Sequence, residues 1–423
     1  MEFWYKFLTY LFYPFTPIYL FLRKLKKKED AYRYKEKMSK IEKPRGNGFL
    51  VWIHIASVGE AMSILPLIDR FEKEQKIDKI LITSITLSSG KILSKKFAQN
   101  SKVIHQFLPL DIPWFTKKFL NHWNPNLSIF IDSEIWPNLI LQINKKKIPL
   151  LLVNARITKK SFNRWNLAIS FAKKIFSKFD LCIVSNEESK NFLKVLGAKN
   201  IKSYGNLKFS DTNKDLSQKL DSSFLDKIKN RRVWCAASTH PSEEIFCAKS
   251  HLRIKKDYNS VLTIIIPRHI DRIKKINKEL LNLNLKTVLS SNSDQIDSST
   301  DILLVDSYGE TLKFYDISKY VFLGKSLIKS LMHDSGQNPI EPAKLGCKIL
   351  HGPNVSNFAE TYSYFKKLGI TKEVNNESEL STAIVENFKE DEDKNYEIVK
   401  KIEDYGLNIL NNVSKEIKKY INT

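Results

Sequence analysis

Short apolar runs recur along this chain, and longer amphipathic stretches lie between them. Each run is too short for a core helix and is rich in β-branched residues, which predicts a buried strand of a parallel sheet. The runs form two blocks: FLVWIHI, KILITSIT, LSIFIDSE, PLLLVNARI and LCIVSN, then VWCAAST, VLTIIIPRH, DILLVDS, YVFLGK and CKILHG. Strand–helix alternation in two blocks predicts an α/β protein with two doubly wound domains.

The length of the chain also favours two domains, since 423 residues exceed what one hydrophobic core usually serves. A polar stretch from Ser210 to Ser223 separates the two blocks, so we place the linker near residue 212. We expect a membrane anchor and basic linker over residues 1–45 and a Rossmann-like domain over 46–212. A second Rossmann-like domain, with C-terminal helices, is expected over 213–423.

The anchor is predicted from residues 3–22, which are mostly apolar and aromatic but are interrupted by Lys6, Pro14 and Pro17. Twenty helical residues are about 30 Å long, enough to cross a bilayer. The basic run Arg23–Lys28 follows, and no signal-peptide cleavage site is present. A basic flank in this place holds the downstream chain in the cytoplasm. The pattern fits a helix that spans the bilayer and also a helix that lies in the membrane interface. The alternative is a helix packed on the protein's own core.

The formal charge of +23 predicts an anionic partner. Nucleic acid, an anionic membrane surface and a phosphorylated substrate all carry such charge, although lysine-rich composition throughout the chain is an alternative explanation. Aromatic and basic residues are not interleaved as they are in nucleic-acid platforms, so nucleic acid is not expected. The four cysteines are scattered without a C-x-x-C pair, which argues against a disulfide framework or a zinc site.

The residues that follow the predicted strands are the candidates for chemistry, because ligands of such sheets bind beyond the carboxyl ends of the strands. These turns are unusually polar: ASVGE, DSEIWPN, NARITKKS and GNLKFS in the first block, ASTHPSEE, PRH, DSYGE and GQNPIEP in the second. A Walker A loop and a G-x-G-x-x-G motif are both absent from the sequence, so neither a P-loop NTPase nor a dinucleotide oxidoreductase is supported.

Taken in order, SVGE, SEIWPN, NAR, GNLKF, STH, PRH, GE and NPIEP resemble the turns of one family, the 3-deoxy-D-manno-octulosonic acid (Kdo) transferases of lipopolysaccharide synthesis. The resemblance runs from about Phe49 into the 360s. It implies a GT-B glycosyltransferase, in which two Rossmann-like domains face a central cleft. It also implies transfer of Kdo from CMP-Kdo to a lipid A precursor, with inversion, at the cytoplasmic face of the inner membrane.

Three residues of the first block are the catalytic candidates. The resemblance implies that Glu60 is the general base, that Glu134 stabilises the transition state or orients the base, and that Lys208 neutralises charge near the donor. Each has a structural alternative. Ser57-Val58-Gly59-Glu60 fits the S-x-x-E capping box, in which Glu60 only closes a helix turn. Glu134 could cap a helix, and Lys208 could be a solvated surface lysine.

The second block is expected to bind CMP-Kdo. Arg268 can pair with a phosphate or carboxylate through two N–H groups, and Gly309 lets the backbone approach a ligand closely. Asn338 and Glu341 could bind cytosine or ribose. An interdomain salt bridge for Arg268 and a helix cap for Glu341 are the alternatives. The complete predicted set is Pro267, Arg268, Ser307, Tyr308, Gly309, Glu310, Asn338, Pro339, Ile340 and Glu341.

No metal and no cofactor are predicted, because His240 and His269 lack ligand partners at metal-binding spacing. Two other classes of function fit parts of the sequence. A different GT-B glycosyltransferase or a sugar epimerase would share the architecture, and a non-catalytic, membrane-tethered binding protein would explain the anchor and the charge.

Overall fold

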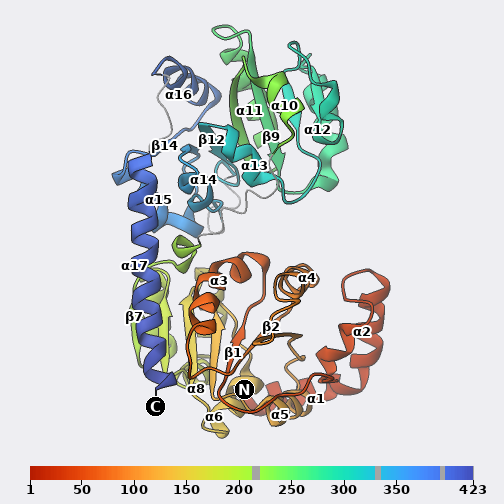
Figure 1. The fold of residues 1–423 in the computed structure, drawn as a ribbon, viewed down its shortest axis with the longest axis vertical. Coiled ribbons are helices and arrows are strands. Elements are labelled where there is room, and N and C mark those ends of the chain that lie inside the picture. The colour runs from red at the N-terminus through yellow and green to blue at the C-terminus, as the bar shows by residue number, and fades with distance from the viewer. Residues whose placement is uncertain (212–219, 329–334, 391–395, 423) are drawn as a thin grey trace. The chain divides into compact units, whose positions relative to one another are not determined.

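The computed structural model describes residues 1–211, 220–328, 335–390 and 396–422. It divides into two compact units, Met1–Asn213 together with Tyr405–Thr423, and Lys214–Asp404. Each unit is built on one parallel sheet of seven strands (Figure 1). The linker predicted near residue 212 lies outside the described residues.

The sheet of the first unit has the order β3-β2-β1-β4-β5-β6-β7, and every pair of neighbouring strands is parallel. All residues of β1, β4, β5 and β6 are buried, as expected for strands that helices cover on both faces. The strands are β1 (Leu50–His54), β2 (Lys79–Ser84), β3 (Val103–Phe107), β4 (Leu127–Ile131), β5 (Leu150–Ala155), β6 (Leu181–Val184) and β7 (Ile201–Ser203).

The second unit repeats this arrangement in the order β10-β11-β9-β8-β12-β13-β14, again entirely parallel. Each of the ten apolar runs contains a strand. The four strands that were not predicted, β3, β7, β10 and β14, lie at the edges of the sheets, where burial is less complete and the apolar signal is weaker. The strands are β8 (Arg232–Thr239), β9 (Val261–Pro267), β10 (Thr287–Leu289), β11 (Ile302–Leu304), β12 (Tyr320–Leu323), β13 (Lys348–His351) and β14 (Thr371–Glu373).

The helices of the first unit connect its strands and supply its core. Trp52 of β1, for example, packs on Phe119 of α5 and Phe130 of β4, with ring centroids 5.0 and 5.2 Å apart. The connecting helices are α3 (Val58–Glu72), α4 (Leu87–Lys96), α5 (Pro113–Trp123), α6 (Pro137–Lys145), α7 (Lys159–Asn166), α8 (Ile169–Phe176) and α9 (Glu187–Leu196), and the 3₁₀ helix η3 (Leu207–Ser210) follows β7.

The N-terminal segment forms two short helices rather than one long helix. Helix α1 (Glu2–Phe12) and helix α2 (Thr16–Leu25) are joined by η1 (Tyr13–Phe15), and the predicted interruptions Pro14 and Pro17 lie at this junction. In the part of the chain that the structure describes, no helix is long and apolar enough to cross a membrane. The 3₁₀ helix η2 (Arg33–Met38) continues the segment.

The segment is held to the first unit on one side and exposes apolar side chains on the other. Tyr5 donates a hydrogen bond of 2.8 Å to Asp111, and Leu20 is buried. Both oxygens of Asp111 in turn accept the first free N–H groups of α6. The exposed large apolar residues of α1, η1 and α2 are Phe3, Trp4, Phe7, Leu8, Tyr10, Leu11, Phe12, Tyr13, Phe15, Ile18, Tyr19, Phe21, Leu22 and Leu25.

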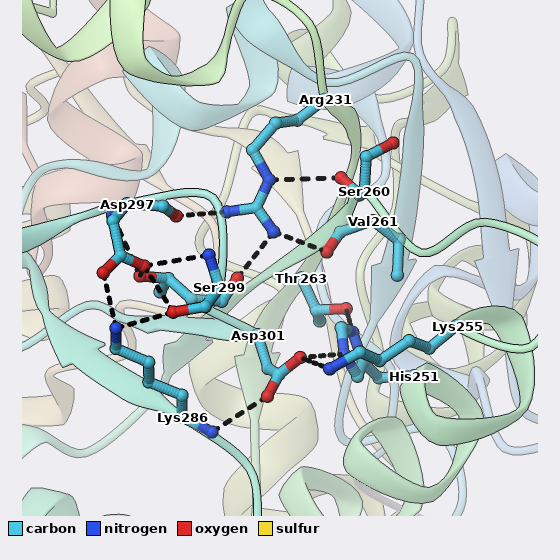
Figure 2. Close-up of polar contacts among 11 residues, drawn as sticks. Arg231, His251, Lys255, Ser260, Val261, Thr263, Lys286, Asp297, Ser299 and Asp301 are labelled. Atoms are coloured by element: carbon cyan, nitrogen blue, oxygen red, sulfur yellow. Dashed lines mark hydrogen bonds and ion pairs between the residues drawn. The ribbon is translucent and has the colours of Figure 1, made fainter.

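The second unit carries the helices α10 (Ser222–Ile228), α11 (Glu243–Ile254), α12 (Ile273–Leu281), α13 (Thr311–Ile317), α14 (Ile340–Lys344), α15 (Ala359–Lys367) and α16 (Glu377–Glu390). A polar network ties the amino ends of β8, β9, β10 and β11 together (Figure 2). Arg231 donates to four main-chain carbonyls, and Asp301 accepts from His251, Lys255 and the main chain of Lys286. Burial raises the pKa of Asp301, but these hydrogen bonds outweigh it and hold that pKa well below its usual range. The network stabilises the end of the sheet opposite to the predicted donor site.

The last helix, α17 (Tyr396–Ile421), departs from the predicted boundaries, because Tyr405–Thr423 belongs to the first unit and not to the second. Figure 1 shows α17 beside β7. Glu416 pairs with Lys202 of β7 and accepts from Tyr204, while Arg70 of α3 donates to Ser414. These long-range contacts, which the sequence order does not reveal, explain the difference.

Candidate active site

The two predicted carboxylates of the first unit follow the two strands at its topological switch point. Neighbours β1 and β4 lie in the middle of the sheet, where the strand order reverses, and ligands of doubly wound sheets bind there. Glu60 opens α3 after β1, and Glu134 lies in the turn after β4. The sheet therefore brings together residues that are 74 positions apart in the sequence.

Glu60 is held by the start of its own helix. Ser57 is the N-cap of α3, and its hydroxyl accepts the N–H of Glu60. The Glu60 carboxylate accepts from the Ser57 hydroxyl at 2.9 Å and from the main-chain N–H of Ala56 at 2.7 Å. The capping box is thus present in a variant form. The Glu60 carboxylate accepts a hydrogen bond from the N–H of Ala56, the residue before the N-cap, and not from the N–H of the N-cap itself.

The environment of Glu60 disfavours its charge. Only 9% of the residue is exposed, and burial raises its pKa most strongly, followed by the charge of Asp132 and, with a smaller effect, that of Glu134. The hydrogen bonds from Ala56 and Ser57 act in the opposite direction, and the pKa of Glu60 comes to about 7. A carboxylate with a pKa near the working pH has the property expected of a general base.

Glu134 is anchored through one oxygen. Its Oε2 accepts a hydrogen bond from the indole N–H of Trp136 at 2.9 Å and lies 3.2 Å from Nε2 of His54, which is the last residue of β1. Among the described residues, Oε1 of Glu134 has no hydrogen-bond partner. Helix α6 begins only at Pro137 and Trp136 is its N-cap, so the helix-cap alternative for Glu134 is wrong.

Lys208 lies near a third carboxylate that the sequence did not single out. Its Nζ is 4.0 Å from Oδ2 of Asp132, and its side chain is 23% exposed, so the alternative of a fully solvated lysine does not hold. Asn154 links the two turns, since its amide group donates to Asp132 and accepts the N–H of Leu207 at 2.8 Å. Asp132 and Asn154 both have a φ of +57°. Asn154 also sits at a bulge between β5 and β6, which aims its side chain along this edge of the sheet.

Sequence reasoning missed His54, Asp132 and Asn154 as members of the site. A signal was present for Asp132 and Asn154, because each is a polar residue that ends a strand run, in DSEIWPN and NARITKKS. His54 lies inside the run FLVWIHI, and nothing local distinguishes it from an ordinary core histidine.

In the second unit, the Pro267–Arg268 turn ends β9. Pro267 is buried and Arg268 is exposed, with its main-chain N–H bonded to the carbonyl of Thr239. Its guanidinium contacts no carboxylate among the described residues. Arg268 is therefore available to an anionic ligand at the carboxyl end of the sheet.

The turn after β11 is exposed and precedes a helix. Ser307, Tyr308 and Gly309 are exposed, and Gly309 has a φ of +88°, which favours glycine. Ser307-Tyr308-Gly309-Glu310 also fits the S-x-x-E pattern, but α13 begins at Thr311 and Glu310 is its N-cap, so Ser307 and Glu310 form no capping box. Glu310 pairs instead with Lys313 at 2.8 Å.

The NPIEP turn is organised by its own polar side chains. Asn338 accepts the N–H of Ile340 at 3.1 Å and donates to the carboxylate of Glu341, also at 3.1 Å. Pro339 and Ile340 are buried, whereas Glu341 is exposed. Helix α14 has only five residues, so the two side chains, and not a long helix, form this part of the candidate donor site.

A buried carboxylate, Glu243, shapes the loops around these turns. It accepts four main-chain N–H groups, those of His240, Lys325, Ser326 and Leu327, at 2.7–3.1 Å. Gly324 makes this possible, because a Cβ there would lie 2.7 Å from the Glu243 carboxylate and 2.6 Å from the Ser238 carbonyl. The residues after β8 and β12, which flank the switch point of this sheet, are thereby fixed to each other.

The described residues include no group of three or more His, Cys, Asp or Glu side chains that could hold a metal ion. All four cysteines are buried thiols outside any disulfide, and Cys235, Cys247 and Cys347 lie within the second unit. The prediction that the chemistry needs no metal or cofactor stays a prediction.

Comparison with known proteins decides the family. Residues 32–211 match the family model described as 3-deoxy-D-manno-octulosonic-acid transferase (kdotransferase). The chain is 37% identical over 352 residues to the 3-deoxy-D-manno-octulosonic acid transferase of Rickettsia bellii, covering 83% of this chain and 82% of the relative. The chain belongs to the Kdo transferase family. The enzyme of the same name from Haemophilus influenzae is 30% identical over 339 residues, covering 79% of this chain and 78% of the relative.

Solved structures agree with the architecture of a Kdo transferase. The UDP-GlcNAc 2-epimerase from Neisseria meningitidis, solved with UDP-GlcNAc bound, superposes with a TM-score of 0.58 at 14% identity, covering 88% of this chain and 99% of that chain. At this identity the likeness shows the fold alone, which is GT-B-like as predicted. Membership of the Kdo transferase family excludes the epimerase and binding-protein alternatives.

Proposed function

We propose that this Kdo transferase acts on a lipid A precursor, with Glu60 as the general base and with inversion at the anomeric carbon. As a member of its family, the protein transfers Kdo from CMP-Kdo in lipopolysaccharide core biosynthesis. The observation that carries the proposal is the buried Glu60 carboxylate, whose pKa is about 7 beside Asp132 and Glu134.

In the proposed reaction, Glu60 removes the proton from the acceptor hydroxyl as its oxygen attacks the anomeric carbon of Kdo. The bond from that carbon to the CMP phosphate oxygen breaks, and CMP leaves with the electron pair. Attack from the face opposite to CMP inverts the anomeric centre. CMP is already a good leaving group, so the main work of the enzyme is to activate the acceptor and hold anionic groups in place.

The other predicted residues have supporting roles in this proposal. Glu134 stabilises positive charge that develops on the sugar, through Oε1, which no described residue contacts by a hydrogen bond. Lys208 balances negative charge near the donor. In the second unit, Arg268 binds the phosphate or the Kdo carboxylate. Asn338 and Glu341 bind hydroxyl or amino groups of the cytidine. The main chain of the turn Ser307–Glu310 lies close to the donor.

The N-terminal segment is proposed to dock on the cytoplasmic face of the inner membrane. Its two short helices expose a large aromatic and aliphatic surface, with Phe3, Leu8 and Ile18 each more than 60% exposed. The basic run that follows suits anionic lipid. Tyr5 connects this surface through Asp111 to the start of α6, directly after the Glu134 turn, which supports delivery of a lipid acceptor to the same unit.

Substitution of Glu60 tests the proposal and separates catalysis from capping. Glu60→Gln keeps an acceptor for the Ala56 N–H and a partner for Ser57, so the protein should stay folded, yet glutamine cannot take a proton. We expect kcat to fall by about 10²–10⁴, the usual contribution of a general base. The assay is release of CMP from CMP-Kdo with saturating acceptor.

The matched variant is Ser57→Ala, which removes the cap and leaves the carboxylate. It should cost about 0.5–2 kcal/mol of stability and affect turnover less than Glu60→Gln does. Near-normal turnover by Glu60→Gln would leave this residue with a capping role only.

A further inference from the structure

A chain of buried polar groups runs through the sheet behind Glu134. The indole N–H of Trp52 donates to the hydroxyl of Thr83 at 2.9 Å, and this hydroxyl lies 2.9 Å from Nδ1 of His54. On the other side of the imidazole ring, Nε2 lies 3.2 Å from Oε2 of Glu134. Trp52, Thr83 and His54 are all 0% exposed, so these side chains are shielded from bulk solvent.

The donors and acceptors of this chain determine where its protons lie. An indole nitrogen can only donate, so the Thr83 oxygen accepts from Trp52 and must direct its own proton elsewhere. Nδ1 of His54 is the acceptor within reach among the described residues. A proton on Nδ1 would be donated to the hydroxyl or the carbonyl oxygen of Thr83, 2.9 and 3.2 Å away, and in either case the hydroxyl proton would be buried without an acceptor among the described residues. With Nδ1 bare, a neutral His54 carries its proton on Nε2.

We propose that Thr83 and His54 are positioning residues for Kdo transfer: the Thr83 hydroxyl holds His54 in the tautomer protonated on Nε2, and this N–H holds the Glu134 carboxylate in its orientation. The inference rests on the proposed catalytic role of Glu134. Oε2 then receives two N–H donors, from His54 and from Trp136, which fix the orientation of the carboxylate. Oε1 is left for the substrate.

The position of Glu134 also affects the pKa of the proposed base, Glu60. Glu60 lies on α3, Asp132 lies in the Glu134 turn, and Lys208 of η3 lies 4.0 Å from Asp132. The charge of Glu134 is one of the causes that raise the pKa of Glu60. Without the His54 N–H, the Glu134 carboxylate can turn away from its present position. Its charge then raises the pKa of Glu60 less, so Glu60 ionises at lower pH, and the charge that faces the substrate is misplaced.

The plainer explanation is that His54 is a core histidine whose ring nitrogens only form hydrogen bonds with their neighbours. That explanation assigns no particular tautomer to the ring and no effect on the pH dependence of the reaction. The two explanations therefore differ in observable quantities, apart from any loss of stability.

The first measurement is the ¹⁵N NMR spectrum of the full-length protein labelled at histidine, with the His54→Gln variant used to assign the signal. Between pH 7 and 8, Nδ1 should have the chemical shift of a bare ring nitrogen and Nε2 that of a protonated one. A proton on Nδ1 in the wild-type protein overturns the proposal. This measurement needs no other variant to fold and no activity.

The second measurement compares Thr83→Val, which removes the hydroxyl and keeps the shape, with Thr83→Ser, which keeps the hydroxyl. Thr83→Val should transfer the proton to Nδ1 and lower kcat by about 10- to 100-fold, the scale of one lost charge-assisted hydrogen bond. The acid limb of its pH–rate profile should move to lower pH, because the displaced Glu134 charge raises the pKa of Glu60 less. Thr83→Ser should keep both the tautomer and the profile.

An unchanged profile in Thr83→Val, with the fold intact, overturns the proposal. Failure of the underlying assignment has a different signature: Glu134→Gln would then turn over normally, whatever the NMR spectrum of His54 shows.

Discussion

At the scale of the residue, the charges around Glu60 predict how the reaction depends on pH. A general base must be ionised, and the pKa of Glu60 is raised from its ordinary value to about 7, so kcat/KM should rise with pH and level off above about pH 7. Asp132→Asn and Glu134→Gln each remove a negative charge that opposes ionisation of Glu60. Both should move the acid limb to lower pH, and Asp132→Asn should move it further, because its charge has the larger effect.

Initial rates of CMP release, measured between pH 5 and 9 with each variant, check this order. Lys367→Gln, a change of charge in the second unit, serves as the control and should leave the limb in place. An acid limb that stays near pH 7 in both carboxylate variants would mean that it reports a group other than Glu60.

At the scale of the element, helix α17 supports the turn that carries Lys208. Tyr405 packs edge-on against Phe209 of η3, with ring centroids 5.0 Å apart. Gly406 allows this contact, since a Cβ there would lie 2.0 Å from the Phe209 carbonyl oxygen. Gly406→Ala should therefore displace η3 or α17, and with it Lys208, although alanine is the better helix former by about 1 kcal/mol.

The expected result of Gly406→Ala is a lower melting temperature together with a lower kcat. Leu407→Ala is the matched control on the same helix, because Leu407 is 53% exposed and its truncation removes little packing. If Gly406→Ala were as stable and as active as Leu407→Ala, α17 would have no role in holding the Lys208 turn.

At the scale of the whole molecule, the division into two units predicts that donor and catalytic effects separate. Arg268 lies in the second unit, and loss of one charge-assisted hydrogen bond costs about 1.5–3 kcal/mol. Arg268→Ala should raise the KM for CMP-Kdo about 10- to 100-fold and leave the KM for the acceptor nearly unchanged. A change in the acceptor KM alone would contradict the placement of the donor site.

The N-terminal segment offers a second prediction at this scale. Deletion of Met1–Lys28 would also remove the hydrogen bond from Tyr5 to Asp111 and the ion pair between Arg23 and Glu29. Substitutions of exposed residues therefore test membrane binding more cleanly. Phe7→Ser combined with Leu11→Ser should abolish sedimentation with anionic vesicles and keep turnover on detergent-dispersed acceptor. Tyr5→Phe is the control, which should lower stability but keep vesicle binding. Vesicle binding that survives the double substitution would refute the proposed membrane surface.

The sequence by itself determined what depends on near neighbours in the chain. The short apolar runs and their β-branched composition predicted ten strands that helices cover on both faces, because a strand buried on both faces must be apolar along its length. Ser57 and Glu60 are three residues apart, so the cap between them is a local property. The edge strands β3, β7, β10 and β14 escaped prediction because partial exposure weakens that requirement.

Only the tertiary structure decided which distant residues meet. Ser307 and Glu310 repeat the capping pattern of Ser57 and Glu60, yet α13 begins after Glu310, since the same four letters do not fix where a helix starts. His54 reaches Glu134 across 80 residues because β1 and β4 are neighbours in the sheet. The pKa of Glu60 depends on such encounters, as burial and the charge of Asp132 exist only once the sheet has formed.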